Sequence, residues 1–361
     1  MPGVYISWPF CAQKCTYCNF ASGVFPKELE GRYADRLAQE IAGTGWPWTP
    51  ETVYWGGGTP SQIDNETVRR IMGLLPGRPW PEATMEAAPG TFDAGRIAAW
   101  RDAGINRVSL GVQSFNDNEL RRTGRKHTAG IVAADVAALR ANGIPDFNID
   151  LIAGLAGQTP ESWEQSLDAA LALNPPHVSV YMLEVDEDSR LGLEILQNGN
   201  RYGARDVPTE EATAAMYERA VERLAAAGIV RYEISNFARP GNESRHNLKY
   251  WRLEPYLGFG ADAHSFAGGQ RWQNVELAAS YVAAPALRLP AETANPAEER
   301  FFVGLRLTAG VAPTPAEWAL HGPALHRFIS QGLMEKDGQT VRLTSRGILL
   351  SNEIFQEFLS A

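Results

Sequence analysis

The chain has 361 residues, of which 44% are hydrophobic and 21% are charged, and its formal net charge is −9 at pH 7. These are values of ordinary folded proteins, and no apolar run reaches the roughly 18–20 residues of a membrane span. The negative charge argues against broad attraction to nucleic-acid phosphates. Because no basic region followed by an apolar segment begins the sequence, we expect a cytoplasmic protein.

Short β-like runs alternate with longer amphipathic segments over the first two thirds of the chain. The predicted strands are 4–8, 52–55, 84–87, 107–112, 147–152 and 177–182, and the predicted helices between them are 27–42, 66–75, 94–103, 130–141 and 161–173. Asn65, Asp93 and Thr159 are suited to cap helix N-termini. Six strands that alternate with helices predict an α/β fold with a parallel sheet, and we favour a partial (β/α)6 barrel over its rival, an open doubly wound sheet.

The remainder of the chain is organised differently. A long helix is predicted over 209–227, whereas 232–273 is rich in Gly, Asn and aromatic residues and is interpreted as loop-like. The tail predicts a helix over 324–331, a hairpin over 333–343 that turns at Asp337-Gly338, and a helix over 345–359. This tail resembles a small winged-helix unit, and its balanced charge favours structural packing over DNA reading. We therefore predict a barrel over 1–231, an extension over 232–290 and a C-terminal winged-helix-like domain over 291–361.

The three cysteines of the protein, Cys11, Cys15 and Cys18, lie within eight residues of one another. An odd number of thiols in an expected cytoplasmic chain is a poor fit to disulfides. Structural zinc would need a fourth ligand, and no second thiol pair exists. A [4Fe–4S] cluster held by three thiolates would leave one iron open to a small molecule. The odd count suits such a cluster, while structural zinc and inert core thiols remain the alternatives.

The spacing Cys-x3-Cys-x2-Cys directly after a predicted strand is similar to that of the radical S-adenosylmethionine (SAM) superfamily. This resemblance implies that the amino and carboxylate groups of SAM bind the open iron. It also implies that an electron from the reduced cluster breaks the sulfonium C–S bond of SAM and releases a 5′-deoxyadenosyl radical. The protein's own part would then be to orient the cofactor and to exclude competing reactions.

Polar or glycine-rich motifs also follow the later predicted strands. The sequence "YWGGGTP" follows the second strand, and its glycines allow close backbone approach to a ligand. Glu86 ends the third strand, Gln113 ends the fourth, "GRKH" supplies Arg125, and Asp150 lies on the fifth. A single carboxylate at a strand end is more often a cap or an ion-pair partner. Several such residues on successive strands are expected to meet at one mouth, at the carboxyl ends of the strands.

The motifs "YISWPFC", "GGGTP", "GVQSF", "GRKH", "NIDLI" and "LNPPHVSVYML" resemble, over essentially the whole chain, the family that contains oxygen-independent coproporphyrinogen III oxidase and the haem chaperones related to it. One departure is Ser7, where the family usually has histidine, which removes a hydrogen-bond donor near the expected cluster. Carried over by motif, the implied SAM contacts are Tyr5, Gly58, Thr59, Glu86, Gln113, Arg125 and Asp150, with Tyr17 flanking the same site.

Two features distinguish the branches of this family. The oxidase branch generally carries a further cysteine two positions after the third cluster cysteine, and this chain has Phe20 there. The sequence "RHNLKYW" contains the HNxxYW motif associated with haem binding in the chaperone branch. By this resemblance His246 is a haem ligand, and Tyr250 and Trp251 can stack on the macrocycle, with the 232–290 extension on the haem side. A buried His246 that only hydrogen-bonds a loop is the structural alternative.

The remaining histidines carry less information. His264 is a weaker candidate, either as an axial haem ligand or as a residue that closes the SAM site. His127, next but one to Arg125, can line the same mouth or serve the structure. The other three are interpreted as structural, namely His177, His321 and His326.

The resemblance implies a radical-SAM-type haem chaperone rather than a catalyst in the ordinary sense. It would bind a [4Fe–4S] cluster, SAM and haem, and deliver haem to acceptor haemoproteins such as respiratory enzymes. An electron donor is an implied partner, nucleic acid is not, and a membrane would be met only through the acceptors. The open iron also raises a cluster-dependent homodimer as a prediction. The alternative is an oxygen-independent coproporphyrinogen III dehydrogenase that forms protoporphyrinogen IX by oxidative decarboxylation.

Overall fold

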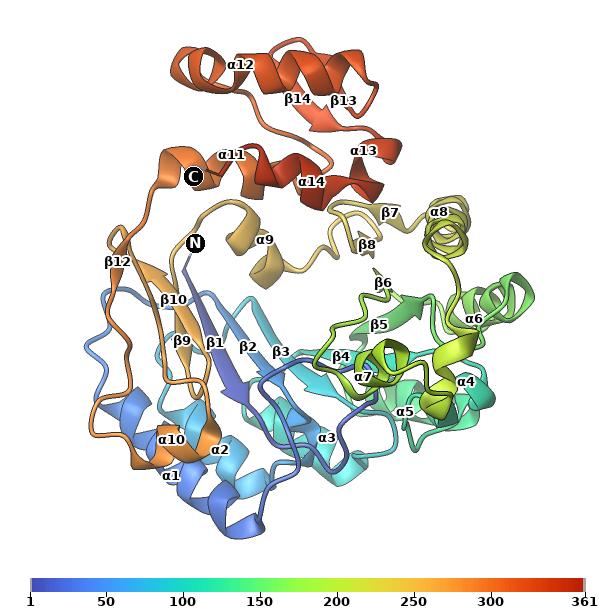
Figure 1. The fold of residues 1–361 in the computed structure, drawn as a ribbon. Coiled ribbons are helices and arrows are strands. Elements are labelled where there is room, and N and C mark those ends of the chain that lie inside the picture. The colour runs from blue at the N-terminus through green and yellow to red at the C-terminus, as the bar shows by residue number, and fades with distance from the viewer. Residues whose placement is uncertain (1, 360–361) are drawn as a thin grey trace.

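A computed structural model of the chain describes residues 2–359, apart from the side chains of 297 and 298. Within these residues one twelve-stranded sheet carries the fold, in the order β12-β11-β10-β9-β1-β2-β3-β4-β5-β6-β8-β7. Its centre is six parallel strands in chain order: β1 (Gly3–Trp8), β2 (Thr52–Gly57), β3 (Glu82–Ala87), β4 (Arg107–Gln113), β5 (Asp146–Ala153) and β6 (His177–Met182). A doubly wound sheet would reverse its strand order near the middle. The predicted partial barrel is thus confirmed, and Figure 1 shows its curvature.

Helices cover the outer surface of this curved sheet (Figure 1). The longer ones are α1 (Lys27–Ala42), α2 (Asn65–Gly73), α3 (Ala94–Asp102), α5 (Ala129–Ala141), α6 (Pro160–Ala172) and α8 (Glu210–Ala226). Asp93 and Thr159 cap α3 and α6 as predicted, whereas the predicted cap Asn65 is wrong. Asp64 caps α2 instead, because its carboxylate accepts a hydrogen bond from the Thr67 N–H at 2.9 Å.

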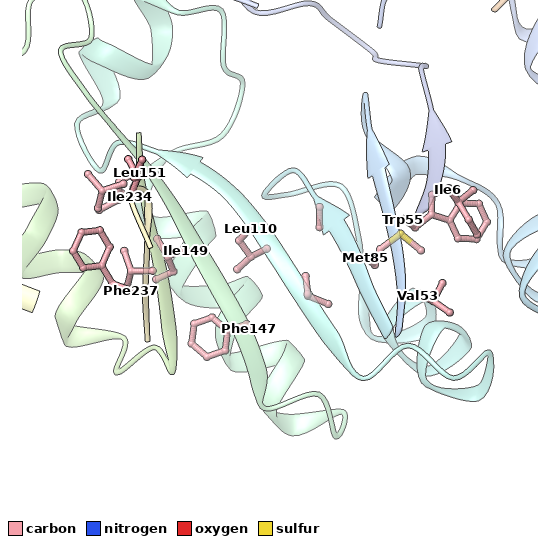
Figure 2. Packing of buried hydrophobic residues seen from close by; sticks show 14 of the residues in the cluster. Ile6, Val53, Trp55, Met85, Leu110, Phe147, Ile149, Leu151, Ile234 and Phe237 are labelled. Atoms are coloured by element: carbon pink, nitrogen blue, oxygen red, sulfur yellow. The ribbon is translucent and has the colours of Figure 1, made fainter. Parts of the chain in front are cut away.

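The hydrophobic core lies between the sheet and these helices. Val53, Trp55 and Met85 on β2 and β3 are fully buried, and so are Leu110 and Ile149 on β4 and β5. Figure 2 shows these side chains along neighbouring strands, where each outward-facing apolar residue packs beside that of the next strand. Because side chains alternate along a strand, the residues between them point into the barrel. The core therefore determines which residues face the interior.

Short strands extend the sheet on both sides of the six parallel strands. On one side β9 (Tyr256–Phe259) is parallel to β1, and β10 (His264–Ala267), β11 (Gln270–Gln273) and β12 (Glu292–Thr293) follow in antiparallel order. On the other side lie β8 (Asn236–Ala238) and β7 (Val230–Arg231). The interpretation of 232–273 as loop-like is therefore wrong. These strands are two to four residues long, so they are too short to give a periodic signal.

Shorter helices connect the strands and cover the ends of the barrel. They are α4 (Asp117–Arg122), α7 (Arg190–Leu196), α9 (Arg245–Trp251) and α10 (Ala278–Ala283), with 3-10 turns at Pro60–Gln62 and Arg201–Asp206. Helix α9 packs at the end where the strands begin, since the Thr52 side chain at the start of β2 contacts His246 of α9 at 2.8 Å. The loop that carries the three cysteines follows β1 and lies at the opposite end (Figure 1).

The C-terminal residues form a separate layer beyond α9, on the side where the strands begin (Figure 1). This layer contains α11 (Pro296–Gly304), α12 (Pro315–Ser330), the hairpin β13 (Met334–Asp337) and β14 (Thr340–Leu343), α13 (Ser345–Leu349) and α14 (Ser351–Gln356). The predicted hairpin is present. The predicted helix over 324–331 begins earlier, because Thr314 and Glu317 form a capping box. Over the described residues, no helix is long and apolar enough to cross a membrane.

Candidate cofactor site at the barrel mouth

The carboxyl ends of the parallel strands surround a cavity of about 480 Å³, which we call the mouth cavity. All three cysteines line it, and so do seven of the eight predicted SAM contacts: Tyr17, Gly58, Thr59, Glu86, Gln113, Arg125 and Asp150. The eighth, Tyr5, lines an adjoining cavity of about 200 Å³ that shares Glu86 and Gly57 with the first. The structure thus brings together residues from β1 to β5 that lie up to 145 positions apart in the sequence.

The glycine motif after β2 holds the cysteine loop in place. The Gly58 N–H donates to the Trp8 carbonyl at 2.7 Å, and the Thr59 N–H donates to the Phe10 carbonyl at 2.9 Å. A Cβ atom at Gly58 would lie 2.6 Å from the Phe10 oxygen and 2.9 Å from the Cys11 sulfur. Both distances are below van der Waals contact, so residue 58 must be glycine for the loop to come this close.

The opposite side of the cysteine loop is held by later segments. The Thr16 N–H donates to the Thr123 carbonyl at 3.1 Å, and the Thr16 carbonyl accepts from the Leu191 N–H of α7 at 2.9 Å. Among residues 2–359 no three His, Cys, Asp or Glu side chains are gathered as the ligands of a single metal ion would be. The three thiols form no disulfide and all line one cavity, as the ligands of a shared group would.

Glu86 is the buried carboxylate on the β2–β3 side of the mouth cavity. Its Oε1 accepts a hydrogen bond from the Tyr54 hydroxyl at 2.9 Å, and its Oε2 accepts one from the Gly57 N–H at 3.0 Å. Burial raises the pKa of Glu86 to about 7, because water is removed from the charged form. The carboxyl group therefore changes its charge near neutral pH.

Asp150 of β5 belongs to a polar network that the sequence analysis missed. Ser109 donates to its carboxylate at 3.2 Å, and the Asn148 amide contacts both Ser109, at 2.8 Å, and Ser179, at 3.0 Å. Burial raises the pKa of Asp150 as well. The register pairs Glu86 with Ser109 and Asp150 with Ser179 on neighbouring strands. The polar residues at alternate positions of "NID" and "RVS" were the signal that could have revealed this inward-facing row.

Arg125 lines the mouth cavity beside the cysteine loop. Its Nη2 donates to the Tyr17 hydroxyl at 3.3 Å, while its buried Nε has no hydrogen-bond partner among residues 2–359. A buried guanidinium nitrogen is costly to leave unpaired, so it favours an oxygen from a bound ligand here. Nearby, Gln113 has φ = 70°, where β4 changes register against β5. A non-glycine residue in this region is uncommon, and this one directs an amide into the mouth cavity.

The predicted haem residue His246 lies outside the mouth cavity. It is 1% exposed at the other end of the barrel, where Nδ1 contacts the Thr52 hydroxyl and Nε2 contacts the Tyr250 hydroxyl, both at 2.8 Å. Burial lowers the pKa of His246 to about 3, so its imidazole is neutral at pH 7. Iron ligation by His246 stays a prediction, and it would require one of these hydrogen bonds to break.

The other histidines occupy separate places. His264 is exposed at the start of β10 and does not line the mouth cavity. His127 is buried, its Nε2 contacts the Val112 carbonyl at 3.0 Å, and it is not among the residues that line the mouth cavity. His177 contacts the Asn148 side chain and, at 2.9 Å, the Tyr232 hydroxyl. His321 stacks on Phe301, and the exposed His326 packs at a tilt against Trp318. None of the latter three is among the residues that line the mouth cavity.

Residues 5–170 match the family described as the radical SAM superfamily, and residues 293–350 match the HemN C-terminal domain. Over 99% of the chain, the fold is similar to that of the Escherichia coli coproporphyrinogen III oxidase HemN, a radical SAM enzyme, with a TM-score of 0.84 at 23% identity and 89% of that chain covered. The barrel and the three-thiol cavity at its mouth define a radical SAM protein.

Two curated relatives identify the branch. The chain is 36% identical to the heme chaperone HemW of Bacillus subtilis (strain 168) over 99% of both chains. It is 32% identical to the heme chaperone HemW of Escherichia coli (strain K12), over 99% of this chain and 98% of the relative. The chain therefore belongs to the HemW family, within the radical SAM superfamily.

Membership in this superfamily implies a [4Fe–4S] cluster and SAM as cofactors. The residues present fit both groups. Three unpaired thiols line the cavity, the glycine at 58 permits the close approach of the cysteine loop, and a buried nitrogen of Arg125 points to a missing acceptor. Which of these residues contacts which cofactor stays a prediction.

Proposed function

We propose that this protein is a radical-SAM-type haem chaperone. It would hold a [4Fe–4S] cluster at Cys11, Cys15 and Cys18, bind SAM in the mouth cavity, bind haem, and deliver the haem to acceptor haemoproteins. The observation that carries this proposal is the single cavity lined by all three thiols and by the polar residues of successive strand ends. The named heme chaperones to which the chain is similar over its full length support it.

Phe20 argues against the oxidase alternative. At the position where the oxidase branch would offer a thiol, Phe20 presents a side chain that is 68% exposed beside the mouth cavity. A phenyl ring can neither give up a proton nor ligate a metal. The fold shared with the coproporphyrinogen III oxidase HemN shows the architecture alone, since the identity is 23%.

Different residues of the mouth cavity would bind different groups of the cofactors. When bound, the cluster and SAM supply one-electron chemistry. Glu86 in its charged form would attract the ammonium group of SAM, and Asp150 lies at the same wall to accept hydroxyl hydrogen bonds. Arg125 would pair with a carboxylate. Burial opposes its charge, but Tyr17, Cys15 and Asp150 outweigh this effect and raise its pKa. Tyr5, Tyr17, Gly58, Thr59 and Gln113 complete the proposed contact set.

The proposed haem-binding residues belong to the HNxxYW motif of α9, which includes His246, Tyr250 and Trp251. Under this proposal the protein acts in the cytoplasm, takes electrons from a separate donor, contacts acceptors such as respiratory enzymes, and forms a cluster-dependent homodimer. His264 is retained as a second haem-side residue because it is exposed.

One anaerobic experiment separates carrier from oxidase. Protein with a reconstituted cluster is incubated with reductant, SAM and coproporphyrinogen III, and the products are resolved by chromatography. In parallel, haem-loaded protein is mixed with membranes that contain haem-free respiratory enzyme, and the activity that returns is measured. We expect unchanged coproporphyrinogen III together with restored respiratory activity. Conversion to protoporphyrinogen IX would overturn the chaperone proposal, and so would a failure to bind haem at all.

A further inference from the structure

A second large cavity lies at the other end of the barrel, between the sheet and the C-terminal layer. We call it the α9 cavity. Its volume is about 610 Å³, within the roughly 300–1,000 Å³ of cofactor-sized sites. Four stretches far apart in the sequence build it: α9, the edge strands β9 to β12, helix α11, and Leu359 near the C-terminus. Its lining includes Tyr250, Trp251, Tyr256, Arg271, Phe302 and Val303.

Aromatic rings form much of the wall of the α9 cavity. The rings of Tyr250 and Tyr256 meet edge to face with centroids 4.7 Å apart, and Trp251 adjoins Tyr250 at 6.3 Å. The guanidinium of Arg306 lies 4.4 Å from the Trp251 ring centre, so it fixes the indole in place. The buried Nε1–H of Trp251 has no acceptor among residues 2–359. Such walls suit a flat aromatic ligand, and an unused indole donor favours one that also carries an acceptor.

Charge in the α9 cavity is arranged differently from charge in the mouth cavity. Arg271 of β11 donates to the Tyr256 hydroxyl at 3.2 Å and pairs with Glu299 of α11. Its side chain keeps about a third of its surface exposed, at 32%. A guanidinium has five N–H donors, so Arg271 can also donate to a ligand carboxylate while it keeps these two partners. The mouth cavity instead combines the buried carboxyl groups of Glu86 and Asp150 with the guanidinium of Arg125, which the proposed SAM carboxylate would occupy.

His246 supports this cavity from behind and does not enter its lining. Its Nε2 contacts the Tyr250 hydroxyl at 2.8 Å, and its ring stacks on Tyr54 with centroids 5.2 Å apart. At the start of α9, the Glu82 carboxylate accepts hydrogen bonds from the Ser244 hydroxyl and from the N–H groups of Arg245 and His246, at 2.8–3.2 Å. The histidine of the motif thus positions Tyr250, while Tyr250 and Trp251 face the cavity.

We infer that the α9 cavity is the haem-binding site, and that it recognises the tetrapyrrole macrocycle and a propionate rather than the iron. In this site Trp251, Tyr256 and Phe302 contact the faces and edges of the macrocycle, and Arg271 pairs with the propionate. His246 is a positioning residue that acts through Tyr250. The inference rests on the proposed function. A site without a strong axial bond suits a carrier that has to release its haem.

The first test is a comparison of ligands with the full-length protein. Haem and metal-free protoporphyrin IX are titrated separately, and binding is followed by quenching of tryptophan fluorescence. We expect the two dissociation constants to agree within about fivefold and the ligands to compete for one site. Tight haem binding without protoporphyrin binding would overturn the inference and leave the chaperone proposal intact. Absence of haem binding would overturn the chaperone proposal itself.

The second test fills the cavity. Val303→Trp places an indole on the cavity side of α11 and is expected to weaken both ligands at least tenfold. The matched control is Leu320→Trp on α12, where the native side chain is 71% exposed, and it should bind like the wild type. If Val303→Trp does not fold, Phe302→Ala replaces it, because this variant removes a wall and should weaken binding several-fold. Wild-type affinity in a folded Val303→Trp or Phe302→Ala variant would show that haem binds elsewhere.

The third test uses changes with opposite signs. Arg271→Gln removes the cation and should weaken both porphyrins about tenfold, as the loss of a charge-assisted hydrogen bond does. Glu299→Gln removes the competing carboxylate and should strengthen binding several-fold. Arg288→Gln is the control, since Arg288 lines a separate cavity beside the same edge strands. Effects of the same sign from Arg271→Gln and Glu299→Gln would contradict the charge assignment.

The fourth test addresses His246 and the iron. His246→Gln preserves a hydrogen-bonding partner for Tyr250, whereas His246→Ala does not. If His246 acts only through Tyr250, haem affinity should fall in the alanine variant, recover in the glutamine variant, and change equally for protoporphyrin IX. A loss confined to haem, with an altered haem absorption spectrum in both variants, would identify His246 as an iron ligand and overturn the inference.

Discussion

The two ends of the barrel present different chemistry to a ligand. At the mouth, loops that follow consecutive strands bring thiols, buried carboxylates and an unpaired arginine nitrogen into one cavity. At the α9 end, aromatic rings from the edge strands, α9 and α11 form the walls, with one arginine–glutamate pair. The first suits a small charged cofactor and a metal cluster, and the second suits a flat apolar ligand. One barrel can therefore hold two kinds of ligand without competition between them.

The largest expected effect tests whether the two ends are independent. Cys15→Ala removes one of three proposed cluster ligands, so the reconstituted protein should lose its cluster completely, measured as iron, acid-labile sulfide and visible absorption. Haem affinity should stay within about twofold of the wild type. The control is Ala12→Ser, an exposed change in the same loop. Loss of haem binding along with the cluster would show that the two ends form one site.

The next effect is a pH dependence at the mouth. The pKa of Glu86 is raised to about 7, whereas an unfolded glutamate titrates near 4.3. Between these values the native protein holds a proton that the unfolded chain has lost, so the free energy of unfolding should fall as pH rises through this window. The contribution lost by Glu86 is on the order of 3 kcal/mol. Denaturant titrations from pH 4 to 8 should show a flatter profile for Glu86→Gln and an unchanged slope for the exposed control Glu66→Gln.

A smaller effect is expected from the glycine that touches the cysteine loop. Gly58→Ala would place a Cβ 2.6 Å from the Phe10 oxygen and should cost about 2 kcal/mol, as overpacking does. Cluster loading should fall with it, because the loop has to shift. The control Gly31→Ala lies in α1 with nothing within 4 Å of the new Cβ, so it should stabilise the protein by about 0.5–1 kcal/mol. Equal cluster loading in the Gly58→Ala and Gly31→Ala variants would show that the cluster does not depend on the glycine at position 58.

The smallest effect concerns the anchor of α9. Glu82→Gln removes the charge that accepts three hydrogen bonds at the start of the helix, and should lower the free energy of unfolding by about 1.5 kcal/mol. Haem affinity should weaken while cluster loading stays unchanged, measured on the same sample. The exposed Glu187→Gln serves as the control. An effect on the cluster alone would contradict the separation of the two ends.

The six parallel strands and the mouth residues could be predicted because their signals are local. Each strand is an apolar run bounded by turn residues, and the carboxyl ends of parallel strands must meet at one edge. The spacing of Cys11, Cys15 and Cys18 needed no knowledge of the fold. The predicted strand over 177–182 agrees with β6 residue for residue.

The α9 cavity could not be predicted in the same way. Its walls come from residues near positions 250, 271, 302 and 359, and no pattern within one of these segments points to the others. Its strands are too short for a visible period, as β12 with two residues illustrates. The HNxxYW motif indicated that α9 is functional, but it did not indicate which of its side chains faces the ligand. That depends on Thr52 and Glu82, which hold His246 inward from distant strands.

The attachment of the cavity walls also bears on how fast a ligand can leave. Helix α9 is fastened to the barrel by the buried carboxylate of Glu82 and by the contact between His246 and Thr52. Across the cavity, α11 is linked to β11 by the part-exposed pair of Glu299 and Arg271, which water can readily replace. The start of α11 is therefore held less firmly than α9, whereas its end is held by Arg306, which packs on Trp251 and pairs with the buried Glu233. The exit barrier for haem would be set by the lifting of the start of α11, and an acceptor protein that pulls on the C-terminal layer would accelerate transfer without touching the haem.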